Sequence, residues 1–142
     1  MTTTGLDVFD TTAQKTMLWL KEIDEELGWE QRHDAYQALR GCLHEVRDRL
    51  PLNEMAHLAA QLPLLIRGIF YEGWDPSHPP KGRSADDFIN GLIKDIPWQT
   101  DYDFEAVTRA CLKTLSRNVD AGMARHVRKA MPESIRQLWP DI

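Results

Sequence analysis

The second half of this chain repeats the first half in one continuous register. Residues 84–141 align without a gap on residues 15–72 when they are moved back by 69 positions. The apolar positions of the two halves coincide, and the proline that interrupts the first half at Pro63 recurs at Pro132. Such a repeat indicates an internal duplication, so we expect a fold of two similar halves. The pairs that are identical in this register are Trp29/Trp98, Asp34/Asp103, Arg40/Arg109, Cys42/Cys111, Leu43/Leu112, His57/His126, Pro63/Pro132, Ile66/Ile135 and Arg67/Arg136.

The apolar residues of the first half recur every three or four positions, which is the spacing of one face of a helix. We expect the first helix to start at a capping box in Thr11–Gln14 and to end at Gly28. A second helix is predicted from a longer apolar stripe whose charged neighbours lie off it. The stripe of the first helix is Met17, Leu20, Ile23 and Leu27, and that of the second is Ala35, Ala38, Leu39, Cys42, Leu43, Val46 and Leu50.

Prolines and glycines divide the rest of the sequence. Pro51 ends the second predicted helix, and Pro63 separates two shorter ones. Residues 74–83 hold three prolines and a glycine, so they are predicted to be a connector. The sequence Ser84–Asp87 is a second capping box, and the helix that it opens is predicted to end at Pro97.

These patterns predict an all-α fold: a tandem duplication of a four-helix unit, with about eight helices in one compact domain. No strand-like alternation of apolar and polar residues competes with them. The predicted boundaries are a flexible N-terminal tail at 1–11, a first four-helix repeat at 12–73, the Pro-rich connector at 74–83 and a second four-helix repeat at 84–142.

The composition is that of a soluble globular protein. Hydrophobic residues make up 42% of the chain and the net charge is −5. No apolar run approaches the roughly 20 residues that a membrane-spanning helix needs, and the N-terminus lacks the pattern of a secretory signal. Two cysteines do not make a disulfide framework. We therefore expect a cytoplasmic location and no membrane partner.

Three stretches of the first half stand in one order at close spacing: Val46–Leu50, Leu58–Pro63 and Arg67–Trp74. Together they resemble the bacterial family called domain of unknown function 2267. The segment Met131–Pro140 is similar to that family's closing segment, with Met131 where a leucine is usual. The resemblance covers nearly the whole chain and implies an all-helical prokaryotic protein in two similar halves. It implies no activity and no catalytic residues, and it suggests a stress-related context.

The sequence contains no arrangement of side chains that favours catalysis or metal binding. The five histidines lack the spacing of a helix-borne metal site. Cys42 and Cys111 share one repeat position inside apolar stripes, which is typical of small buried residues. There is no Gly-x-Ser-x-Gly motif and no Gly-rich phosphate loop. We therefore expect no enzyme activity, no cofactor and no metal.

One candidate binding site comprises three arginines and two aromatic residues of the first half. Guanidinium groups bind carboxylate or phosphate with two hydrogen bonds, so this set is suited to a small anion or a peptide carboxylate. In the alternative interpretation, the aromatic rings hold the connector in place while the arginines pair with nearby Asp and Glu. The residues are Arg47, Arg49, Arg67, Tyr71 and Trp74.

A second candidate site is a basic segment of the second half, at Arg125, Arg128 and Lys129, followed by Arg136. Two short helices joined at Met131-Pro132 resemble a helix-turn-helix with a basic strip for phosphates. The equivalent first-half segment is uncharged apart from a histidine, and an acidic chain repels nucleic acid, so an ordinary solvated face is the other interpretation.

The hypothesis from sequence is thus a non-catalytic helical module that binds a partner protein or a small anionic ligand, in a stress-related context. The alternative is a nucleic-acid-binding protein that uses the basic face of the second repeat.

Overall fold

In the computed structural model, which describes residues 4–77, 79, 81–97 and 101–142, the chain forms eight α-helices and no strand. The prediction of an all-α fold with about eight helices is therefore confirmed. Residues 1–3 of the predicted tail, residues 78 and 80 of the connector, and Trp98 lie outside the described residues. The helices are α1 (Asp7–Leu27), α2 (Arg32–Arg47), α3 (Leu52–Ala60), α4 (Leu64–Tyr71), α5 (Ala85–Ile93), α6 (Phe104–Arg117), α7 (Ala121–Ala130) and α8 (Glu133–Arg136).

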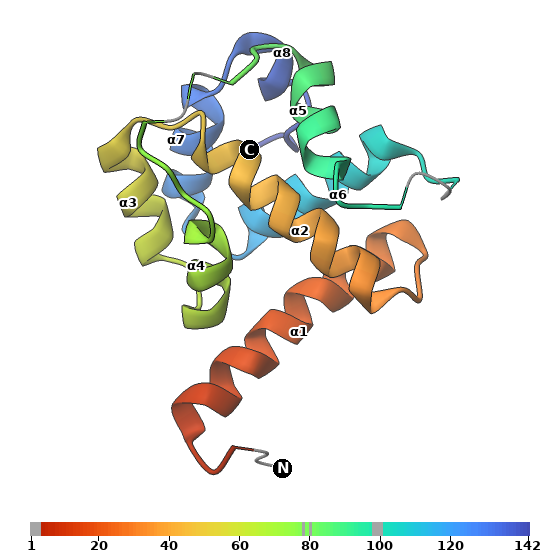
Figure 1. Cartoon of the computed structure of the whole chain (residues 1–142), viewed down its shortest axis with the longest axis vertical. Coiled ribbons are helices and arrows are strands. Elements are labelled where there is room, and N and C mark those ends of the chain that lie inside the picture. The colour runs from red at the N-terminus through yellow and green to blue at the C-terminus, as the bar shows by residue number, and fades with distance from the viewer. Residues whose placement is uncertain (1–3, 78, 80, 98–100) are drawn as a thin grey trace.

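Helix α2 runs through the middle of the molecule and packs against α1, α4, α5 and α6 (Figure 1). Its apolar stripe is the one predicted from sequence. Every stripe residue of α2 itself, from Ala35 to Val46, is fully buried, and Leu50 beyond its end is partly buried. A helix with four helical neighbours needs a broad apolar face, which this stripe supplies.

Several predicted helix boundaries are confirmed. Gly28 follows α1 with a φ of 69°, a left-handed conformation that glycine adopts without steric cost. Pro63 stands at the N-cap of α4, where the missing N–H is not needed by the helix. Pro51 stands at the N-cap of α3, but the second helix does not reach it, because α2 ends at Arg47 and a turn follows. Both hydrogen bonds of the capping box between Ser84 and Asp87 are present at the start of α5.

The predicted start of the first helix is wrong. Helix α1 already begins at Asp7, so Thr11 lies inside the helix and part of the segment 1–11 is helical. Thr12 instead accepts a hydrogen bond from the N–H of Leu65 (2.8 Å). A Thr-x-x-Gln sequence does not stop a helix, because both residues also fit a helix interior once tertiary contacts support it.

Two further predictions need correction. Met17 was expected on the buried stripe of the first helix, but it is 48% exposed and Trp19 is buried in its place. The side of α1 that meets α2 and α6 carries Trp19, Leu20 and Ile23, and Met17 lies off that side. Helix α5 ends at Ile93 and a turn follows before Pro97, with the Ile96 N–H donating to the Ile93 carbonyl (2.9 Å).

The helix bounds agree with the register of 69 residues. Moved back by 69, α6 covers 35–48, α7 covers 52–61 and α8 covers 64–67, so they fall on α2, α3 and α4. Helix α5 falls on residues 16–24 of the much longer α1. Residues 7–15 of α1 correspond to residues 76–84, of which the described ones are not helical and belong to the connector and the N-cap of α5.

Both halves contribute to one hydrophobic core. Ile23, Leu39 and Phe70 from the first half are buried together with Phe88 and Trp139 from the second. Polar contacts also join the halves, such as the ion pair between Lys113 and Glu26 (2.9 Å). None of the described helices is long and apolar enough to cross a membrane.

Candidate functional site

The first candidate site is built around Arg47 at the end of α2. Its Nη1 donates to the carbonyls of Phe70 and Glu72, both at 2.9 Å, at the C-terminal end of α4. Its Nε and Nη2 donate to the two carboxylate oxygens of Asp48 at 2.8 and 3.1 Å. The side chain is 5% exposed. Arg47 therefore fastens α4 to α2 with its guanidinium group.

Arg49 is held in a similar way on the other side of α2. Its Nη1 donates to the carbonyl oxygen and to the carboxylate of Glu45, and its Nε donates to the carbonyl of Gly82 in the connector (3.0 Å). The guanidinium carbon lies 5.1 Å from the centre of the Phe88 ring, within range of a cation–π interaction. Arg49 thus ties the connector and the start of the second half to α2.

Arg67 and the two aromatic residues complete the first set. Arg67 donates to the carbonyls of Ala59 (2.9 Å) and Leu62 (3.0 Å), where α3 ends and leaves its last carbonyls without intrahelical partners. The rings of Tyr71 and Trp74 lie 6.1 Å apart, and Trp74 is 37% exposed beside a hollow of about 200 Å³.

These contacts support the alternative interpretation of the first candidate site. An anion that approaches Arg47 or Arg49 has to replace hydrogen bonds that already hold buried carbonyls and carboxylates, which is costly inside a protein. The structure places Arg47 and Trp74 around one hollow that Arg49 and Arg67 do not line, and the three arginines donate to carbonyls and carboxylates of the protein itself.

A larger cavity of about 660 Å³ lies beside α2, between the end of α4, the connector and the end of α5. Arg40 at its wall pairs with Glu72 and with Asp95 (2.9 Å). The bond from Arg40 lowers the pKa of Glu72. Lys81 pairs with the buried Glu45 (3.5 Å). Because acidic and basic groups alternate and pair along this wall, the cavity offers no surplus of positive charge to a ligand.

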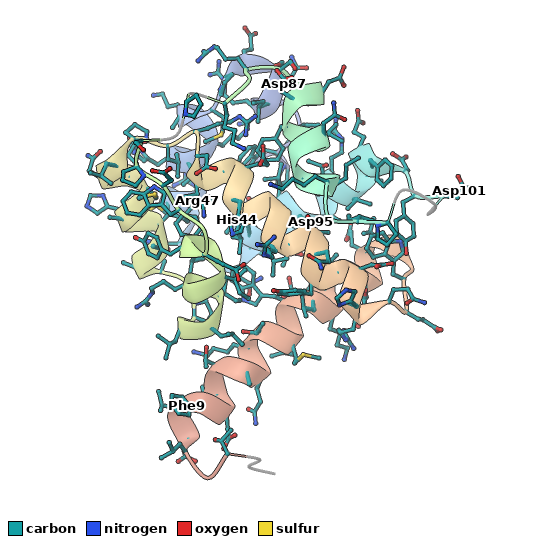
Figure 2. The ribbon with its side chains drawn as sticks, viewed as in Figure 1. Phe9, His44, Arg47, Asp87, Asp95 and Asp101 are labelled. Carbon is teal, nitrogen blue, oxygen red and sulfur yellow. The ribbon has the colours of Figure 1, made fainter. Side chains whose placement is uncertain are left out.

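His44 also lines this cavity (Figure 2). Its Nε2 lies 2.7 Å from the Ile69 carbonyl oxygen, and burial lowers the pKa of the imidazole. Since Nε2 must carry a proton to donate to that carbonyl, His44 acts as a neutral link between α2 and α4.

The second candidate set is brought together around one depression, which we call the basic hollow. Arg125, Arg128 and Lys129 on α7 and Arg136 on α8 line it, and its volume is about 440 Å³. The other lining residues are Glu133, Gln137 and Ile142. Four cationic side chains therefore share a hollow with the carboxylate of a single acidic side chain.

The charge pattern of α7 is not explained by helix stability alone. Arg128 and Lys129 lie in the last turn, where the helix dipole favours cations. Arg125, however, lies one turn earlier than Lys129 on the same face, and like charges at this spacing are destabilising. The equivalent residues of the first repeat, Ala56, Ala59 and Ala60, are uncharged.

Two donors of the basic hollow are buried and unsatisfied. The Nε atoms of Arg128 and Arg136 are shielded from solvent and have no hydrogen-bond partner among the described residues. Arg67, the repeat equivalent of Arg136, uses its Nε to bond the Ala59 carbonyl. Both halves therefore have an arginine at this position, but only the Nε of Arg67 bonds a carbonyl among the described residues.

The family model described as an uncharacterized conserved protein, DUF2267, matches residues 16–139. The chain belongs to this family. The match begins one residue after the start of the 69-residue register and includes α8, so it contains the four cationic residues of the basic hollow but not Ile142. A search of the curated proteins finds no match to the chain.

The two cysteines and His126 of this DUF2267 protein have contacts that are typical of structural residues. Cys42 and Cys111 are buried and free, as expected, and burial raises the pKa of both thiols. His126 of α7 contacts Glu54 of α3 (2.7 Å) and so joins the two repeats. No group of three or more His, Cys, Asp or Glu side chains that could hold a metal occurs in the described part of the chain.

Proposed function

We propose that this protein is a non-catalytic helical module that binds a small anionic ligand in the basic hollow. The observation that carries the proposal is the convergence of Arg125, Arg128, Lys129 and Arg136 on one hollow with one acidic side chain. In a chain of net charge −5, four cations in one place are a local exception.

The chemistry of the hollow is suited to a carboxylate or phosphate group. Guanidinium groups donate paired hydrogen bonds to such anions, and a lysine adds a mobile positive charge. The volume of about 440 Å³ lies in the range of small-molecule sites.

The residues around the hollow are better suited to binding than to catalysis. Arginine and lysine near helix ends hold an anion without supplying a nucleophile, and the two thiols of the chain are buried with raised pKa values. We place the protein in the bacterial cytoplasm, because two free cysteines are typical of a reducing compartment.

Nucleic-acid binding through the same residues is the alternative. It requires a recognition helix long enough to lie in the major groove, and α8 has four residues. The acidic chain around the basic hollow also opposes a long polyanion more than a small one. The geometry therefore favours the small ligand.

The experiment is a thermal-shift and calorimetric titration with inorganic phosphate, citrate and a nucleoside diphosphate. Ligand binding raises the melting temperature of the wild type, because it stabilises only the folded state. The double variant Arg125→Gln/Lys129→Gln is expected to lose at least tenfold in affinity, whereas Arg117→Gln, an exposed charge change on α6, is expected to bind as the wild type does.

An absence of binding by all three probes, or equal binding by the double variant, overturns the proposal. A salt-dependent mobility shift of a short DNA duplex that the double variant loses, without binding of the small anions, supports the alternative instead.

A further inference from the structure

The first nine residues of α1 form an extension to the duplicated fold. The described residues among 76–84, which correspond to residues 7–15, are not helical, and residues 7–15 precede the DUF2267 match, which begins at residue 16. The extension projects from the helical body (Figure 1). Its Thr12 accepts a hydrogen bond from the backbone N–H of Leu65 at the start of α4.

The N-terminal two-thirds of α1 carries apolar side chains that are half exposed among the described residues. Of the ten exposed large apolar side chains among the described residues, five lie on α1 or at its N-cap. Figure 2 shows Phe9 on this part of the helix, away from the core, and Phe9 is 49% exposed. The five are Leu6, Val8, Phe9, Met17 and Leu18.

A groove runs along one side of this helix. Its volume is about 520 Å³, and Ala13, Met17 and Leu18 supply its apolar lining. Its polar lining residues are the buried Asp10 and the exposed Gln14, Lys21 and Arg32, the last of which belongs to α2. A short helical segment such as residues 7–15 is only marginally stable in water without tertiary contacts. A groove beside such a segment is therefore suited to a second helix that packs against it.

The charges along the exposed side of α1 can pair between two copies of the helix. Asp7, Gln14 and Lys21 are spaced by seven residues, so they lie along one stripe of α1. Gln14 and Lys21 line the groove, and Asp7 lies one turn before its first lining residue, Asp10. An antiparallel copy centred on Gln14 brings Asp7 of each chain opposite Lys21 of the other. The opposed helix dipoles of such a pair are also favourable.

We propose that this groove binds a second copy of the chain, through antiparallel pairing of the two α1 helices about Gln14. The proposal goes beyond anion binding, since the groove and the basic hollow share no residue. A standard interface buries about 800 Å² on each partner. An area of about 800 Å² is a small part of the 7989 Å² surface of the chain. A projecting helix can bury such an area without a rearrangement of the core.

The test is the oligomeric state of the full chain, measured by sedimentation velocity over a range of protein concentrations. The wild type is expected to shift from monomer to dimer as its concentration rises. Asp7→Lys and Lys21→Asp each place like charges at both ends of the pair and are expected to raise the dissociation constant roughly tenfold. An equimolar mixture of these two variants has opposite charges at both contacts and is expected to recover the dimer.

Two control variants separate this proposal from others. Leu52→Glu changes an exposed apolar residue of α3 (65% exposed) outside the groove and is expected to dimerise as the wild type does. Arg125→Gln/Lys129→Gln, which tests the basic hollow, is also expected to dimerise normally. The exposed sites Asp7 and Lys21 leave the core intact, and a circular dichroism spectrum confirms folding.

A wild type that stays monomeric at every concentration overturns the proposal. If the groove binds a different partner, the same monomeric result is expected. A dimer that both charge reversals leave unchanged, or that the mixture fails to recover, overturns the antiparallel register. Neither outcome bears on anion binding, which is measured separately with phosphate, citrate and a nucleoside diphosphate.

Discussion

Arg47 is the residue whose replacement tests most directly how this fold is held together. In the variant Arg47→Met the apolar stem is kept while the guanidinium group is removed. The change deletes the donors to the carbonyls of Phe70 and Glu72 and the two bonds to Asp48. All of these bonds are at the junction of α2 and α4, so the variant weakens the attachment of α4 to the central helix.

The magnitude follows from the burial of the group. The side chains of Arg47 and Asp48 are each 5% exposed, so solvent screens their interaction little. Removing one partner of a buried ion pair costs about 3–5 kcal/mol, because the other charge stays buried. Lys81 lies 3.9 Å from Asp48 and offsets part of that cost. We therefore expect a loss of about 3 kcal/mol in the free energy of unfolding.

The measurement is urea unfolding at neutral pH, followed by circular dichroism. Arg117→Met is the matched control, because it makes the same substitution at an exposed position in the last turn of α6, and it is expected to cost less than about 1 kcal/mol. The double variant Arg47→Met/Asp48→Leu is expected to recover part of the loss, since it removes the buried carboxylate as well. If Arg47→Met unfolds within about 1 kcal/mol of the wild type, the account of Arg47 as the link between α2 and α4 is refuted.

Two further predictions concern glycine packing and pH. Gly41→Ala places a Cβ against the Leu92 carbonyl oxygen, where α2 packs on α5, and is expected to destabilise the fold by about 2–3 kcal/mol in urea unfolding. Gly68→Ala, a control with open space around the new Cβ in α4, is expected to add about 0.5–1 kcal/mol, so equal stability of the two variants contradicts the packing argument. Burial lowers the pKa of His44, so the unfolded chain binds the proton more tightly. The stabilising effect is therefore present above the unfolded pKa of about 6.5 and is lost as the pH falls from that value through the lower pKa of the folded protein. His44→Gln is expected to unfold with a shallower pH dependence than the wild type, and identical pH profiles refute the assignment.

Much of the fold could be predicted from local patterns. The stripe of α2, the glycine after α1 and the prolines before α3 and α4 act through short-range geometry, so they are visible in the sequence. The start of α1 was not visible in that way. Helical residues extend to Asp7 although Thr11 and Gln14 match a capping signature, because a cap is used only where the chain leaves the helix.

The candidate site was predicted in part. The basic residues of α7 stood out in the sequence, and the fold gathers them with Arg136 around one hollow. The arginines near α2 also stood out, but a sequence does not show which carbonyls and carboxylates lie within reach. Arg47 and Phe70 are far apart along the chain, and the packing of α4 on α2 alone makes them hydrogen-bond partners.

The sequence by itself determined that this is an all-helical protein, because periodicity, proline and glycine act locally in both halves. Only the tertiary structure decided what each charged side chain does. Arg47 and Arg49 are buried and donate to carbonyls and carboxylates of the protein itself. The cationic residues of α7 instead line a hollow, and the start of α1 projects from the helical body. The physical reason is that the fate of a charge depends on the groups within a few ångströms of it, and those groups come from distant parts of the chain.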